Sequence, residues 1–242
     1  MSDEAVDVPR YVRLLWGLGD ADGRPGPKRS LDIHDIAAAG VRLADTGGIA
    51  AVSMRAVAAE VGLTSMALYR YVESKRELVL MVLDAAYGPP PHIAAPQRGW
   101  RAQLHDWAVA LRNGLAEHPW VVAVPVGEPP LLPNSVRWME RALQAMHGCD
   151  LTEQQKLSSL LLIDVYVRGQ IALAAGIDVA DADDDSLYAR RLLTLADPDA
   201  FPRLREAMLA GALDDQDSVP TDEFTFGLGA VLDGIGALMT RR

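Results

Sequence analysis

The sequence predicts an all-α protein, and three observations support this. Alanine and leucine dominate long stretches in which apolar residues recur every three or four positions. Runs that alternate between apolar and polar residues, as strands require, are scarce. Only three phenylalanines occur among 242 residues. We therefore expect a small N-terminal helical domain that a long helix joins to a larger C-terminal helical domain.

The N-terminal half predicts four helices after a flexible arm. Residues 1–27 end in a run of glycine and proline. The apolar residues within 11–16 could form a short helix, but a loosely docked extension is the favoured interpretation. A first helix is expected from about Leu31 to Ala44. Ser53 is a good N-cap for the second helix, a short third helix begins at Thr64, and the fourth begins at Ser74. Glu77 completes a capping box for the last of them, which runs to about Tyr87.

Gly88 and three following prolines mark a boundary after that helix. We divide the chain into a flexible arm (1–27), an N-terminal domain (28–87) and a C-terminal domain (88–242). Periodicity in the last part predicts helices over 98–117, 133–147, 152–176, 185–196, 202–211 and 222–240.

Charge and cysteine content narrow the function classes. The single cysteine, Cys149, excludes an internal disulfide, and acidic residues near the N-terminus argue against export. We expect a cytoplasmic protein without a membrane span. The net charge of −10 by itself argues against nucleic acid. Residues 28–80, however, hold seven basic and six acidic side chains, so a DNA-facing surface is confined to that segment.

Residues 53–72 have the spacing of a helix-turn-helix motif. Ala58 is small enough for a second helix to approach, Gly62 suits a tight turn with positive φ, and Leu68 fills the wedge between the helices. An ordinary corner between two helices has the same requirements, so this spacing alone leaves DNA binding open. Neighbouring residues favour DNA: Thr64 to Ala67 form a small uncharged surface, and Tyr69, Tyr71 and Lys75 follow it. Lys28 and Arg29 stand behind the flexible arm.

Residues 28–87 resemble the DNA-binding domain of the tetracycline-repressor (TetR/AcrR) family. The resemblance rests on residues 36–39, 43–48, 53–58, 61–63, 67–72 and 75–78. It implies a homodimeric, ligand-responsive transcriptional regulator with double-stranded operator DNA as its partner. It also implies DNA-facing roles for Lys28, Arg29, Ser53, Arg55, Thr64, Ser65, Met66, Ala67, Tyr69, Arg70, Tyr71 and Lys75.

The C-terminal half resembles the tetracycline-repressor type of C-terminal domain. This rests on residues 118–120, 197–202, 224–228 and 232–235. No His and Glu pair aligns with the magnesium-linked drug ligands of the tetracycline-binding members, which puts tetracycline itself in doubt. The implied fold is an N-terminal three-helix helix-turn-helix domain, a long connecting helix, and a helical domain for effector binding and dimerisation.

Two further sets of residues suit a sensor. Large apolar groups with a few polar partners are candidates for an effector pocket: Trp100, Leu104, Trp107, Trp138, His147, Tyr166 and Gln170. Core packing is the competing interpretation of the same residues. Small and apolar residues on two helices, together with one arginine, are candidates for the dimer interface: Leu161, Val165, Arg168, Gly227, Val231, Gly234 and Leu238.

The sequence offers little for catalysis or metal binding. The five histidines lack zinc-binding spacing, and Asp181 to Asp185 lack the glycine and glutamate of a calcium loop. Neither a phosphate-binding loop nor a recognisable base beside Cys149 is present. We expect no metal, no cofactor and no enzyme activity. The alternative is an α-helical enzyme or ligand-binding bundle without a DNA role.

Overall fold

The computed structural model describes residues 7–18, 31–91, 98–125, 130–176, 185–211 and 219–240, and within these ranges every regular element is a helix. The chain divides into two compact units, residues 1–171 and 172–242. The boundary falls inside helix α8, and each unit is described by itself.

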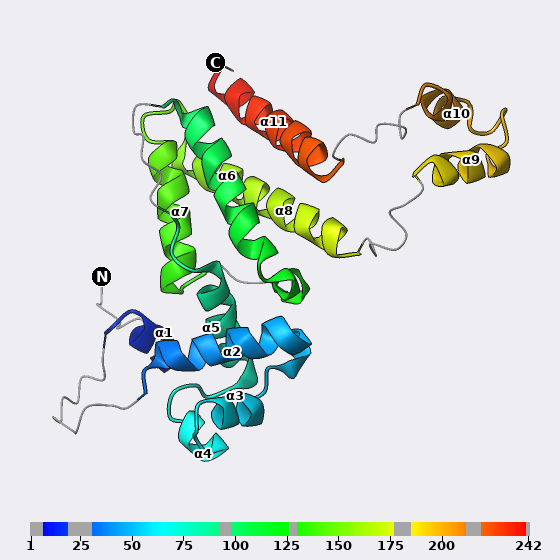
Figure 1. Cartoon of the computed structure of the whole chain (residues 1–242). Coiled ribbons are helices and arrows are strands. Elements are labelled where there is room, and N and C mark those ends of the chain that lie inside the picture. Colours follow the sequence, from blue (N-terminus) through cyan, green and yellow to red (C-terminus); the bar gives the residue numbers. More distant parts are fainter. Residues whose placement is uncertain are drawn as a thin grey trace. The chain divides into compact units, whose positions relative to one another are not determined.

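The N-terminal part of the first unit has the expected order of helices (Figure 1). Its elements are α1 (Arg10–Leu15), α2 (Ile33–Gly47), the 3-10 turn η1 (Ile49–Ala51), α3 (Met54–Glu60), α4 (Ser65–Leu68) and α5 (Lys75–Tyr87). The predicted starts of α3, α4 and α5 are confirmed, but Glu77 Oε2 accepts from the N–H of Glu73 at 2.6 Å, one residue before the position that a capping box with Ser74 requires. The hydroxyls of Ser53, Thr64 and Ser74 each accept a hydrogen bond from the backbone N–H three residues on, at 3.1–3.2 Å.

Helix α1 corrects the expectation of a loosely docked extension. Tyr11, Val12 and Leu15 are buried, and α1 packs against α2. Beyond it, the Trp16 indole N–H donates to the carbonyl of Leu131 at 2.7 Å. At its start, the Arg10 guanidinium donates to the carbonyl of Arg70, just after α4. The apolar residues of this segment are therefore part of the first unit's core. Residues 1–6 and 19–30, the latter including Lys28 and Arg29, lie outside the described residues.

Helices α2 and α5 are in very close contact. Gly40 faces Val82, and a Cβ atom built on Gly40 would lie 2.1 Å from Val82 Cγ2. Only a glycine therefore allows this approach. Ile36, Leu78 and Met81 are fully buried in the same part of the unit.

The remaining helices of the first unit are α6 (Trp100–Ala116), the 3-10 turn η2 (Pro119–Ala123), α7 (Pro133–Ala145) and α8 (Glu153–Gly176). Helices α6 and α7 pack side by side, and both contact α5 (Figure 1). Trp107 and Trp138 meet edge to face with their centroids 5.8 Å apart. The indole N–H of Trp107 donates to the carbonyl of Trp138 at 3.0 Å. Leu104 and Leu111, also on α6, are fully buried.

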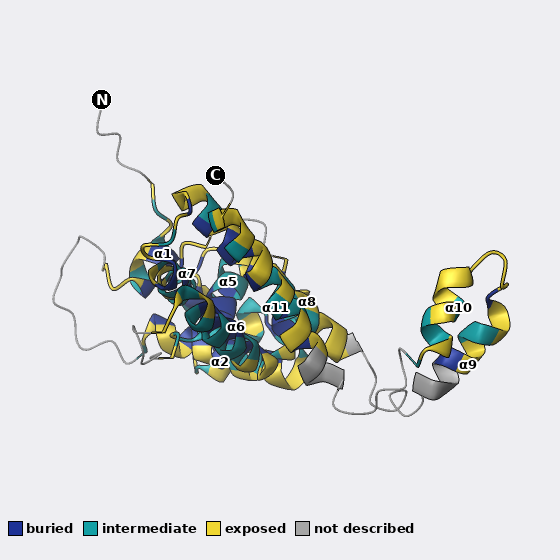
Figure 2. Cartoon of the chain, turned by 90° about the horizontal axis from the view of Figure 1, so that it is seen from above, coloured by how far each residue is buried: buried dark blue, intermediate teal, exposed yellow. Residues whose placement is uncertain are grey.

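The second unit contains the end of α8, α9 (Asp185–Leu195), α10 (Pro202–Leu209) and α11 (Val219–Thr240). Arg205 ties α10 to the end of α9, because its guanidinium donates to the carbonyls of Leu193 and Ala196 at 2.6 and 3.0 Å. Much of the described surface of α9 and α10 is exposed (Figure 2). In α11, one stripe is buried: Phe224, Leu228, Leu232 and Ile235.

Helix α8 is apolar on much of its surface. The helix from Glu153 to Ala175 is long enough to cross a membrane, and 18 consecutive residues within it have a mean hydropathy of 1.4. The core helix of a soluble protein can have the same length and composition. Lys156, Asp164 and Arg168 interrupt the run, and each forms an ion pair with a protein side chain. Helix α8 buries one stripe, which includes Ile163, Val167 and Ile171, and exposes apolar side chains such as Leu161 and Val165 elsewhere.

Candidate DNA interface and its connection to the C-terminal helices

The turn between α3 and α4 has the predicted geometry. Gly62 has φ +70°, the left-handed region that favours glycine. The N–H groups of Gly62 and Leu63 bond back to the carbonyls of Ala59 and Ala58 at 3.2 and 2.7 Å, which closes the end of α3. Ala58 and Leu68 are buried between the two helices. This is a helix-turn-helix, with α4 as the helix that would enter the major groove.

The predicted DNA-facing residues occupy the surface of this motif. Six have exposed side chains: Arg55, Thr64, Met66, Tyr69, Arg70 and Lys75. Four are half-buried: Ser53, Ser65, Ala67 and Tyr71. Two of these ten, Ser53 and Thr64, already use their hydroxyl oxygens as helix caps. The motif therefore presents a small uncharged helix flanked by basic and aromatic side chains.

Helix α5 connects this surface to the C-terminal helices through a buried carboxylate. Asp84 is 3% exposed, and it receives the first backbone N–H groups of α7. Its oxygens accept from the N–H of Asn134 at 3.2 Å, the N–H of Ser135 at 2.8 Å and the Ser135 hydroxyl at 2.7 Å. A carboxylate from one helix thus serves as the N-cap of another.

The last residue of α5 makes a second connection, to α8. Arg168 donates to the Tyr87 hydroxyl from Nε at 3.1 Å and from Nη2 at 2.6 Å. Its Nη1 donates to the carbonyl of Val121 at 3.2 Å, and Asp164 lies 3.5 Å from Nε. Burial raises the pKa of Tyr87 to about 12; the Asp164 carboxylate adds to this, and Arg168 opposes it. The phenol is therefore neutral at physiological pH.

Burial also raises the pKa of Asp164, and the Arg168 guanidinium opposes that effect. Nearby, Trp138 ties α7 to the same end of α5. Its indole N–H lies 3.3 Å from the carbonyl oxygen of Tyr87 and 3.0 Å from that of Gly88. The C-terminal end of α5 is therefore held from α7 and from α8.

A third connection leaves from α2. The Asp45 carboxylate accepts from the Trp120 indole N–H at 2.7 Å, and His118 Nδ1 lies 2.7 Å from the same oxygen. Both partners belong to the segment at η2. The helix-turn-helix is thus connected to the following helices through α2 as well as through α5.

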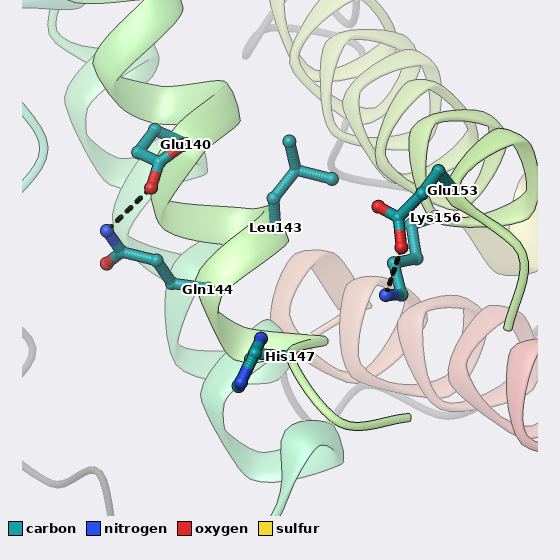
Figure 3. A pocket seen from close by; sticks show the side chains of 6 residues that line it. All are labelled: Glu140, Leu143, Gln144, His147, Glu153 and Lys156. Carbon is teal, nitrogen blue, oxygen red and sulfur yellow. Dashed lines mark hydrogen bonds and ion pairs between the residues drawn. The ribbon is translucent and has the colours of Figure 1, made fainter. Parts of the chain in front are cut away.

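The predicted pocket residues do not share one place. Leu104, Trp107 and Trp138 are buried in direct contact with other core groups, and Trp100, Tyr166 and Gln170 are half-buried. His147 is exposed after the end of α7. It lines an open hollow of about 400 Å³ with Glu140, Leu143, Gln144, Glu153 and Lys156 (Figure 3). Trp107 and Trp138 act as core residues here, and an effector pocket built on this set stays a prediction.

The predicted interface residues also divide. Leu161 and Val165 are each 60% exposed on α8, whereas the side chain of Arg168 is only 14% exposed and is bonded to Tyr87. On α11, Gly227 and Val231 are half-buried, and Gly234 and Leu238 are exposed. The Arg168 guanidinium is therefore engaged within the chain, whereas Leu161 and Val165, near it on the same side of the helix, are open to a partner.

Among the described residues, few side chains are arranged for catalysis or for metal binding. Groups of three or more His, Cys, Asp or Glu that would hold a metal ion do not occur among them. Burial raises the pKa of the Cys149 thiol, with Lys156 opposing, so this cysteine is not activated as a thiolate.

Comparison with known proteins assigns the chain to a family. Residues 36–82 match the family model of bacterial regulatory proteins of the tetR family, and residues 93–239 match the tetracyclin repressor-like C-terminal domain. The chain belongs to the TetR family. It is thereby a ligand-responsive transcriptional regulator, and binding of operator DNA as a homodimer is typical of its family.

Relatives and solved structures agree with this TetR assignment. The transcriptional repressor DrrR1 of Streptomyces coeruleorubidus is 33% identical over 98% of this chain and 88% of its own. A transcriptional regulator of Saccharopolyspora erythraea is 25% identical over 65% of this chain and 66% of its own. The fold matches that of Streptomyces coelicolor ActR in complex with actinorhodin, with a TM-score of 0.73 at 21% identity, over 87% of this chain and 98% of ActR.

Proposed function

We propose that this TetR-family protein is a repressor that binds a palindromic operator and releases it when a small, largely hydrophobic effector binds. The similarity to the repressor DrrR1 supports repression over activation. The observation that carries the release mechanism is α5. Its first residue, Lys75, lies on the candidate DNA surface, and its last, Tyr87, bonds to α8.

The proposed release works through this helix. An effector that packs between the C-terminal helices changes the positions of α7 or α8, which hold α5 at Asp84 and Tyr87. Movement of α5 displaces α4 from its position in the groove. The effector drives this only by its preference for the released conformation, so operator DNA must weaken effector binding by the same factor. ActR, which shares the fold, is known in complexes with actinorhodin and (S)-DNPA.

Calorimetry tests the release mechanism. Natural-product fractions are first screened for thermal stabilisation of the full chain, and the active compound is then titrated with and without operator. We expect operator to lower its affinity. Equal affinities in the two titrations would contradict effector-controlled release, and turnover of the compound would contradict our proposal that the chain is not an enzyme.

Salt dependence tests the DNA contacts. Each phosphate contact adds about 0.9 to the slope of log affinity against log salt. We expect Lys75→Ala to lower that slope by about one unit on every duplex. Arg137→Ala, at an exposed arginine on α7, is the matched control and should leave the slope unchanged. An unchanged slope in Lys75→Ala would remove this residue from the DNA surface.

We place the protein in the cytoplasm, associated with the nucleoid when DNA-bound.

The dimer interface that we propose includes the exposed apolar face of α8 around Leu161 and Val165 and the small-residue stripe of α11 around Gly227 and Gly234. Leu161→Glu puts a charge on an apolar face that a partner would desolvate, and we expect it to produce monomers at micromolar concentration. Asn113→Glu, at an exposed position on α6, is the control. Sedimentation that shows a dimer for Leu161→Glu would exclude this face of α8.

A further inference from the structure

Met66 is an exposed apolar side chain in a motif whose other large apolar groups are mostly hidden. Val57, Leu68 and Val72 are fully buried and hold the helix-turn-helix together. Met66 is 78% exposed at the second residue of α4. It therefore contributes little to the core, and its apolar surface is open to water in the free protein.

The rest of α4 narrows what Met66 can recognise. Its neighbours Ser65 and Ala67 are small and half-buried, so the thioether projects beyond them. No residue of α4, from Ser65 to Leu68, carries a charge, so this helix lacks the guanidinium fork that pairs with guanine. Methionine donates no hydrogen bond, and its sulfur is only a weak acceptor.

Base edges in the major groove offer one apolar group to such a side chain. Thymine carries a C5-methyl group there, whereas the other exposed atoms of the edges are mainly hydrogen-bond donors and acceptors. We infer that Met66 reads a thymine in each operator half-site through contact with this methyl group. The inference rests on the proposed function, because it requires α4 to enter the major groove.

The test begins with an operator obtained from the protein itself. The full-length chain selects binding sites from a pool of random duplexes, and each thymine of the selected site is then replaced by deoxyuridine, which lacks only the methyl group. We expect one thymine per half-site whose replacement weakens binding by about four-fold, the value of burying one methyl-sized group.

Variants at Met66 show whether this side chain is responsible. Met66→Ala should bind the selected site more weakly and lose its sensitivity to deoxyuridine at that thymine. Met66→Leu, which keeps an apolar side chain, should retain the sensitivity. Because Met66 is exposed, both variants should keep the circular dichroism spectrum and the non-specific DNA affinity of the unaltered protein.

Two outcomes overturn the inference while leaving DNA binding intact. One is a selected site in which no deoxyuridine replacement weakens binding. The other is a replacement that weakens the unaltered protein and Met66→Ala equally, which would assign the methyl contact to another residue. Failure to select any site would instead contradict the proposed function.

Discussion

Gly40→Ala tests the close contact between α2 and α5, because its effect on stability should change sign when Val82 is also replaced. Alanine is favoured over glycine inside a helix by about 1 kcal/mol. At Gly40, however, the added Cβ would lie 2.1 Å from Val82 Cγ2, well inside van der Waals contact. Overpacking of this kind costs about 1–3 kcal/mol. We therefore expect Gly40→Ala to lower the free energy of unfolding despite the better helix propensity.

Val82 provides the matched background. Val82→Ala removes both γ carbons, and the remaining Val82 Cβ lies 3.4 Å from the position of the new Cβ, near ordinary contact. In that background, Gly40→Ala should be neutral or should stabilise by up to about 1 kcal/mol. The coupling between the two sites should then be about 2 kcal/mol, within the range of contacting residues.

Equilibrium urea unfolding of the four proteins, followed by circular dichroism, measures the coupling. Protein concentration must be equal in all samples, because dimerisation contributes to apparent stability. Equal effects of Gly40→Ala in the two backgrounds would refute the close approach of α2 and α5. The same four proteins should lose operator affinity in the order of their destabilisation if this contact also sets the position of the helix-turn-helix on α5.

Three other predictions concern the turn and the connections of α5. Gly62→Val should weaken operator binding, because a β-branched residue at φ +70° is strained by about 1–3 kcal/mol. Gly62→Asn should bind operator well, because asparagine tolerates this region. Equal operator affinities of the two variants in fluorescence anisotropy would contradict the positive φ at this turn. Asp84→Ala leaves two N–H groups of α7 without their acceptor, and it should lower the free energy of unfolding in urea by about 3 kcal/mol. Asp106→Ala is the control, because it removes only an exposed ion pair with Arg98 and should cost under about 1 kcal/mol. The folded pKa of Tyr87 lies above that of the free phenol, so the contribution of its neutral form to stability is complete below pH 10 and is lost as pH rises towards 12. Ultraviolet titration should show one late-ionising tyrosine in the unaltered protein and none in Tyr87→Phe. The same titration curve for both proteins would refute the buried phenol.

Local features of this fold were predictable from sequence. Ser53, Thr64 and Ser74 cap helices because a short polar side chain reaches the third N–H onwards, a relation that involves only four consecutive residues. Gly62 was predictable for the same reason. Helix limits differ from expectation by a few residues at most, since periodicity fixes a helix better than its ends.

Contacts between distant segments were not predictable. Asp84 bonds to residues 50 and 51 positions away, and Asp45 to residues 73 and 75 away, so no local spacing reports them. One signal was available: Asp84 is the only charged residue in the last eight residues of α5, where an acidic group requires partners. The tryptophans were recognised as large apolar groups, but sequence does not tell core from pocket when the partners lie on other helices.

Helix α1 changes where this protein can be shortened. A chain started at residue 28 would contain the complete family motif, yet it would lack Tyr11, Val12 and Leu15 and leave bare the apolar surface of α2 that they cover. It would also lose two hydrogen bonds. One joins α1 to the carbonyl of Arg70, beside the recognition helix, and the other joins Trp16 to the carbonyl of Leu131, before α7. An isolated DNA-binding fragment, a fusion protein or a product of a downstream translation start therefore has to contain residues 7–18 to keep the native contacts of α1 and Trp16.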